Sequence, residues 1–227
     1  VKGLQKLREG QGFDPVAAEK ALRASLEKEP CFAPALDALA GLFVSQGRLD
    51  EARALLATAL AVDTYDAEAN YLDGLVLAAR GDRATARERL GLAAYSPLYR
   101  SPALALLSRI CLAEGKYGEA LAVADAALEA NARNIDALAV RVAARRLSGD
   151  RAGAAALAQA AARDLPLHPL FRYELSLCAG GTMAPPRNEF PCKTFTELAG
   201  WYELSGLADD ALALYDRAGA SVVARTR

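Results

Sequence analysis

A glycine recurs every 34 residues in this 227-residue chain, and no other feature constrains the fold as strongly. Gly47, Gly81, Gly115 and Gly149 each stand between two stretches rich in alanine and leucine. Thirty-four residues is the length of a repeat made of two helices joined by a turn. Because such a unit cannot bury its apolar face alone, successive units stack and share a core. The period therefore predicts a helical solenoid with a long grooved surface.

The first complete unit shows how the pattern produces two helices. Its first helix carries apolar residues at i, i+3, i+4 and i+7, namely Leu36, Leu39, Ala40 and Phe43. Gly47 ends that helix, because a residue without Cβ suits the left-handed cap position. Asp50 is expected to open the second helix, and Val62–Asp63–Thr64 to end it. The chain contains almost no alternating β-branched run, so we predict an all-α fold.

The same pattern returns in register and divides the chain. We expect a degenerate first repeat over 1–32 and four regular units over 33–168, with the boundaries 33–66, 67–100, 101–134 and 135–168. After His168 the register breaks, and the remainder is expected to be a lone helix with a Pro/Gly-rich loop (169–191), a final unit (192–219) and the truncated start of a further helix (220–227). Both ends look cut, which favours a piece of a longer protein.

These positions resemble the tetratricopeptide repeat over roughly residues 14–168. That family places a large residue, Leu, Gly/Ala and an aromatic in helix A, then Ala, an aromatic or Leu, Ala and Pro in helix B. The resemblance implies a right-handed α–α superhelix of antiparallel helix pairs, which serves as a non-catalytic protein-interaction or scaffold module. Its partner would be a protein or peptide, and self-association through the terminal helices is a further possibility.

A second, narrower resemblance rests on three short stretches, at residues 63–71, 96–101 and 188–191. They are similar to the C-terminal repeat region of large bacterial proteins that begin with a β-rich, sugar-hydrolase-like domain of unassigned activity. This resemblance implies an alternative function, as the helical accessory region of a carbohydrate-active enzyme whose catalytic domain is not in this chain. A carbohydrate would then be bound through the missing domain.

In tetratricopeptide arrays, the groove is lined by helix A residues at the second, fifth, ninth and twelfth positions. The matching residues here are Asp37, Gly41, Glu68, Tyr71, Leu75, Ala105, Arg109, Leu112, Asp136, Ala139, Ala143 and Arg146. From these and the unusual second repeat, the candidate partner-binding residues are Asp37, Glu68, Asn70, Tyr71, Asp73, Arg109 and Arg146. The chain lacks the Lys/Asn/Arg clamp with which some family members hold a peptide carboxylate.

The second repeat is unusual because Asn70 and Asp73 replace apolar residues. One interpretation is a sugar or peptide site, formed with the neighbouring residues Tyr71, Tyr95, Tyr99 and Arg100. The other, which we favour, is that Tyr65 and Tyr99 staple the turns between repeats while Asn70 caps or bridges the backbone.

Several function classes lack support. The net charge is −1, and the basic helix around Arg141, Arg145 and Arg146 is partly offset by Asp136 and Asp150, so a nucleic-acid partner is not expected. The chain has one histidine, no zinc spacing and no motif for phosphate binding or hydrolysis, so we expect no metal, no cofactor and no enzymatic activity. No uncharged apolar run approaches the roughly 20 residues of a membrane span. The sequence does not indicate the cellular compartment, although the cytoplasm is slightly favoured.

The loop from Gly180 to Lys193 is the main departure from the repeat pattern, because its prolines replace a second helix. We expect Phe190 to tuck against the helix that carries Phe195 and Leu198, while 180–186 stays exposed. Cys178 and Cys192 flank the loop and could approach each other, although nothing marks the chain as extracellular and a disulfide is not favoured.

Overall fold

The computed structural model describes residues 14–184 and 190–223, and all regular structure in this part is α-helical. The expected first helix around Leu4 and Leu7 lies outside the described residues, as do 224–227. The helices are α2 (Pro15–Lys28), α3 (Ala33–Ser45), α4 (Leu49–Val62), α5 (Ala67–Ala79), α6 (Arg83–Ala93), α7 (Arg100–Ala113), α8 (Tyr117–Ala130), α9 (Ile135–Leu147), α10 (Arg151–Asp164), α11 (Pro169–Cys178), α12 (Pro191–Leu204) and α13 (Ala208–Val223). Within the described residues, no helix is both long and apolar enough to cross a membrane.

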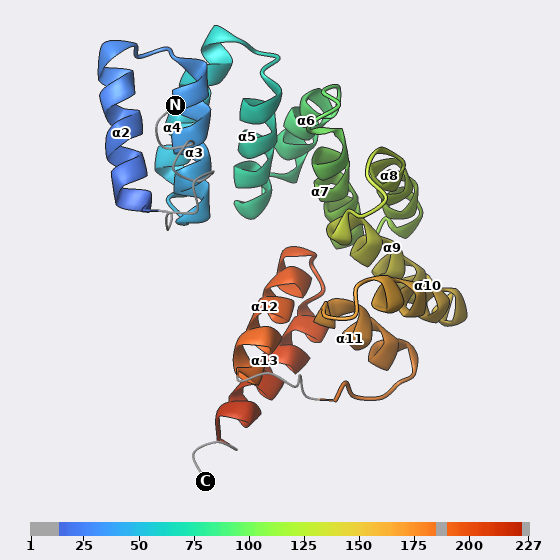
Figure 1. Cartoon of the computed structure of the whole chain (residues 1–227). Coiled ribbons are helices and arrows are strands. Elements are labelled where there is room, and N and C mark those ends of the chain that lie inside the picture. The colour runs from blue at the N-terminus through green and yellow to red at the C-terminus, as the bar shows by residue number, and fades with distance from the viewer. Residues whose placement is uncertain (1–13, 185–189, 224–227) are drawn as a thin grey trace. The chain divides into compact units, whose positions relative to one another are not determined.

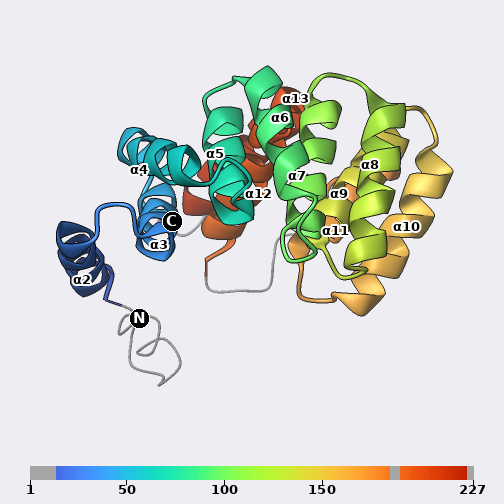
Figure 2. The same ribbon diagram turned by 90° about the horizontal axis from the view of Figure 1, so that it is seen from above.

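The chain divides into two compact units at the Ala103–Leu104 boundary, which lies inside α7. Unit 1 contains α2 to α6, and Figure 1 shows α3–α4 and α5–α6 as antiparallel pairs. Unit 2 contains most of α7 and the helices to α13, and Figure 2 shows α7 to α10 as a row of helix pairs coloured green to gold. The predicted all-α arrangement of helix hairpins is therefore confirmed.

The recurring glycines end the first helix of each pair, as predicted. Gly47 has φ of 73°, and Gly81, Gly115 and Gly149 have φ between 72° and 95°. After Gly47, the amide of Arg48 donates to the carbonyl of Phe43 at 2.9 Å, which closes the last helical turn. The second helix then begins at Leu49, one residue before the expected Asp50, which instead lies in the first turn.

Small residues mark the places where paired helices cross. Ala52 in α4 has no exposed surface and belongs to the same core as Leu39 and Phe43 of α3. An alanine at such a crossing leaves no room for added methylene groups, because protein interiors are close-packed. The crossing distance is therefore set by residues without long side chains.

Ala52→Leu is expected to destabilise unit 1 by roughly 1–3 kcal/mol, because the larger side chain overpacks the crossing. Ala57→Leu is the matched control, since Ala57 lies on the same helix and is exposed. Chemical denaturation followed by circular dichroism measures both. Equal stability of the two variants would show that α4 faces the core differently.

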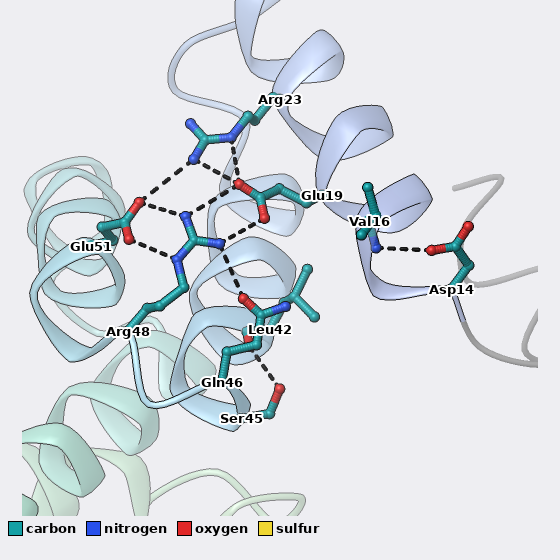
Figure 3. Close-up of polar contacts among 9 residues, drawn as sticks. All are labelled: Asp14, Val16, Glu19, Arg23, Leu42, Ser45, Gln46, Arg48 and Glu51. Atoms are coloured by element: carbon teal, nitrogen blue, oxygen red, sulfur yellow. Dashed lines mark hydrogen bonds and ion pairs between the residues drawn. The ribbon is translucent and has the colours of Figure 1, made fainter.

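Helix α2 packs against the rest of unit 1 without burying any of its residues completely. Its half-buried Ala18, Leu22 and Leu26 pack against the core, and an ion-pair network holds its outer face (Figure 3). Arg48 donates from Nη1 to Glu19 at 2.7 Å and from Nε to Glu51 at 2.7 Å, and its guanidinium lies 3.9 Å from the centre of the Phe43 ring. These bonds to Arg48 lower the pKa of both Glu19 and Glu51. One residue in the turn after Gly47 thus ties α2 to the first complete pair.

The segment after α11 differs from our expectation. Phe190 does not tuck inward, since 59% of its surface is exposed; Met183 packs into the core of unit 2 instead, with 5% exposed. An unbranched methionine can fill the irregular gap left by a missing helix. The carbonyl of Met183 accepts a hydrogen bond from Arg217, whose guanidinium also lies 4.8 Å from the Phe195 ring. Residues 180–182 are exposed as expected, and 185–186 lie outside the described part.

Two boundaries near the C-terminus also need correction. Helix α12 already begins at Pro191, because proline is well suited to the first turn of a helix, so Cys192 and Lys193 are helical rather than part of the loop. Helix α13 runs unbroken to Val223, so 220–223 continue this helix instead of opening another. None of the four cysteines forms a disulfide, so Cys178 and Cys192 are not joined.

Candidate partner-binding face

The helix A face of unit 2, where a partner was expected to bind, is covered by the chain's own C-terminal hairpin, α12–α13. Trp201 and Leu207 of this hairpin pack against a cluster that contains the expected groove residues Ala105, Leu112 and Ala143, all of them buried. The indole Nε1 of Trp201 donates to Asp136 at 2.9 Å. These contacts fill the face with intramolecular packing.

The turn of the hairpin fits closely against the end of α7. Gly206 has φ of 72°, and a Cβ added there would lie 2.9 Å from both Cα and Cβ of Ala113. Real Cβ atoms do not approach backbone atoms so closely. Glycine is therefore needed at 206 for its backbone angle and also for its lack of a side chain.

Arg146, a candidate partner-binding residue, is used inside unit 2. Its Nε donates to Glu174 at 2.8 Å and its Nη2 to Asp210 of α13 at 2.6 Å, and only 9% of its side chain is exposed. Glu174 is fully buried and also accepts a hydrogen bond from Tyr202 at 2.7 Å. Burial raises the pKa of Glu174, and Arg146 opposes that rise. This network links α9, α11, α12 and α13.

Two other candidates, Asn70 and Asp73, serve the interior of unit 1. The Nδ2 of Asn70 donates to the carbonyls of Thr64 and Asp66 at 2.9 and 2.7 Å, so Asn70 bridges the turn before α5, as the favoured interpretation expected. Asp73 is buried and pairs with Arg89 at 3.1 Å. Burial raises the pKa of Asp73, whereas Arg89 and Arg53 lower it.

The remaining candidates in unit 1 lie together. Tyr71 is half-buried, Glu68 is exposed, and Asp37 is buried with 4% of its surface exposed. Tyr99, which the sequence had placed near Tyr71, joins them: its ring centre lies 5.6 Å from that of Tyr71 and its hydroxyl bonds to Glu68. The structure also adds Asp66, the N-cap of α5. We call Asp37, Asp66, Glu68, Tyr71 and Tyr99 the acidic tyrosine cluster.

The structure corrects some of the expectations about the second repeat and its neighbours. Tyr65 does not staple its turn, because its side chain is largely exposed, and Tyr95 is exposed as well. Arg109 is half-buried in the α7 portion of unit 2. Asp66 was missed because its role as a helix cap hides its proximity to Asp37. Asn134, which lies two repeat periods after Asp66, caps α9 in the same way and could have indicated that cap.

Among the described residues, the charges that shift the pKa of Asp37 are negative ones. The Oδ1 of Asp37 is buried without a hydrogen-bond partner in the described part of the chain. Burial is the main reason that its pKa rises from 3.8 to about 7, and the negative charges of Asp66 and Glu68 add to the rise. A buried carboxylate among like charges is unfavourable, so Asp37 keeps its proton up to about pH 7.

This pKa predicts how the stability of unit 1 depends on pH. Between about pH 4 and pH 7 the folded chain holds a proton on Asp37 that the unfolded chain has lost, so the free energy of unfolding falls as the pH rises. The expected loss is on the order of 2–4 kcal/mol. Asp37→Asn cannot lose a proton, so it should match the wild type at pH 4 and unfold at a higher temperature at pH 8. Thermal unfolding at both pH values measures this, and equal melting temperatures at pH 8 would contradict it.

Comparisons with known proteins support the fold. No protein-family model matches the chain, and no curated protein matches it in sequence. A tetratricopeptide repeat protein from Parabacteroides merdae superimposes with a TM-score of 0.67 over 96% of this chain and 90% of its own, at 16% identity. PilF from Pseudomonas aeruginosa superimposes with a TM-score of 0.62 over 93% of this chain and 85% of its own, at 21% identity. YrrB, a tetratricopeptide repeat protein with an unusual peptide-binding site, superimposes with a TM-score of 0.55 over 88% of this chain and 91% of its own, at 18% identity. The predicted tetratricopeptide-type fold is thus confirmed.

Proposed function

We propose that this chain is a non-catalytic protein-interaction module and that it binds a protein or peptide on the helix A face of unit 1. The observation that carries the proposal is the contrast between the two units. In unit 2 the face is filled by Trp201, Leu207 and their neighbours. In unit 1, Glu68 on the corresponding first helix is exposed and lies beside the half-buried Tyr71–Tyr99 pair.

The chemistry of this face suits a protein partner. Tyrosine is enriched among residues that dominate binding energy at interfaces, because it offers a large apolar ring with a polar tip. Repeat solenoids present extended surfaces of this kind along their length. The similarity in fold to YrrB, whose peptide-binding site is unusual, fits a peptide as the occupant.

The test uses two tyrosines with different surroundings. Once a partner that copurifies with the chain has been identified, its affinity is measured for the wild type, Tyr71→Ala and Tyr95→Ala. Tyr95 is the matched control, because it is exposed in a turn of the same unit. We expect Tyr71→Ala to weaken binding at least tenfold and Tyr95→Ala to leave it unchanged. Equal affinity of the two variants would move the site off this face.

A second candidate is the accessory region of a carbohydrate-active protein. Two tyrosine rings 5.6 Å apart beside a carboxylate also suit a sugar, since an apolar ring face and polar groups are then presented together. The complete gene distinguishes the two. A preceding β-rich domain would favour the carbohydrate role, and a free-standing repeat array would favour the interaction module.

A further inference from the structure

Two buried aspartates in unit 1 have opposite surroundings. Asp73 pairs with Arg89 and lies near Arg53, so its charge is neutralised within the chain. Asp37 is equally buried, but its Oδ1 has no hydrogen-bond partner in the described part of the chain, and the charges that act on it are those of Asp66 and Glu68. Buried carboxylates are normally paired, so Asp37 lacks the cation that Asp73 has.

The groups around Asp37 suit a cation. Asp66, the N-cap of α5, and Glu68, in its first turn, add negative charge, and Tyr99 bonds to Glu68. The rings of Tyr71 and Tyr99 lie at 37° to each other with centres 5.6 Å apart. A tyrosine ring attracts an ammonium or guanidinium group placed over its face, and a carboxylate binds both groups through charge-assisted hydrogen bonds.

We infer that the acidic tyrosine cluster receives a basic side chain of the partner protein, an arginine or a lysine, which pairs with Asp37 and Glu68 beside the two tyrosine rings. This inference rests on the proposed function and specifies the chemistry that the partner presents. The exposed Glu68 meets the cation first. Asp37, which is shielded from water, then supplies the stronger interaction because a low-polarity surrounding strengthens ion pairing.

The inference also fixes the pH dependence of binding. Asp37 must release its proton to pair with a cation, and the groups that face it are Asp66, Glu68 and Tyr99. Below its pKa of about 7, each pH unit reduces the ionised fraction of Asp37 up to tenfold. Binding of a basic side chain is therefore expected to be several-fold tighter at pH 8 than at pH 6.

The test titrates the full chain with blocked pentapeptides that carry one central residue between alanines. The central residue is arginine, lysine, methionine or glutamate, and binding is followed by NMR shifts of the Asp37 carboxyl and nearby amides. We expect the arginine and lysine peptides to bind at least tenfold more tightly than the other two. Arginine amide and n-butylamine are titrated as cations outside a peptide. If both bind more weakly than the arginine and lysine peptides, the site recognises a basic side chain that is part of a peptide.

Variants identify the group responsible. Asp37→Asn is expected to reduce affinity for the arginine peptide at least tenfold and to remove the gain between pH 6 and pH 8. Asp164→Asn is the control, because it makes the same substitution at an exposed position of unit 2. Unchanged affinity in Asp37→Asn, or equal binding of the arginine and glutamate peptides, would overturn the inference.

The outcome is separable from that of the proposed function. If Tyr71→Ala weakens binding of the copurifying partner but the basic peptides do not bind, only the assignment of the cation fails. If neither the partner nor any peptide responds to changes at Tyr71 or Asp37, the proposed face itself is wrong.

Discussion

Arg146→Ala is expected to lower the free energy of unfolding of unit 2 by about 3–5 kcal/mol. The arginine pairs with Glu174 and Asp210, and Glu174 has no exposed surface. Removing the guanidinium leaves a buried carboxylate without a counter-charge, which costs far more than the loss of a surface ion pair. Tyr202 alone remains as its hydrogen-bond donor among the contacts described above.

The measurement can be restricted to unit 2, because Trp201 is the chain's single tryptophan and lies in that unit. Urea denaturation is followed by its fluorescence. Arg145→Ala is the matched control on the same helix, since Arg145 pairs with Asp150 at an exposed position and should cost at most about 1 kcal/mol. Similar losses for the two variants would mean that the buried network does not stabilise the unit.

Gly206→Ala is expected to destabilise unit 2 by about 2–5 kcal/mol, through two separate effects. A residue with a Cβ at φ of 72° costs about 1–2 kcal/mol. The added Cβ would also lie 2.9 Å from backbone and side-chain atoms of Ala113, which adds roughly 1–3 kcal/mol of overpacking or forces the hairpin away from α7.

Gly115→Ala separates these two effects. Gly115 has the same φ of 72° and lies in the same unit, but nothing lies within 4 Å of an added Cβ. The stability lost in Gly115→Ala therefore measures the cost of the backbone angle alone. We expect Gly206→Ala to lower the free energy of unfolding by at least about 1 kcal/mol more than Gly115→Ala does, and to shift the fluorescence emission of Trp201. Equal losses would contradict the close docking of the hairpin on α7.

The parts of the fold that sequence could predict are those set by local chemistry. The apolar stripe of α3 and the absence of β-branched alternation each depend on a few consecutive residues, and the spacing of Gly47 to Gly149 is a period that can be read directly from the sequence. They led to the all-α repeat fold and to the positive φ of the recurring glycines. The bridging role of Asn70 followed in the same way, because its partners lie within six residues.

The parts that were missed depend on contacts between residues far apart in sequence. Arg146 was expected to face a partner, but it pairs with residues 28 and 64 positions away. Nothing near Trp201 in the sequence indicates that it reaches Asp136, which lies 65 positions away. The choice of Met183 over Phe190 depends on the shape of a gap that exists only after the helices have packed.

The central claim is that a partner binds the helix A face of unit 1 while the hairpin of unit 2 stays in place. Hydrogen–deuterium exchange of the full chain, with and without the copurifying partner, tests it most directly. We predict that the partner slows exchange in peptides from α3 and α5, which carry Asp37 and Tyr71, and leaves α12 and α13 unchanged. Unaltered exchange in α3 and α5, together with faster exchange in α12 and α13, would contradict the claim, because the partner would then displace the hairpin from the face it covers.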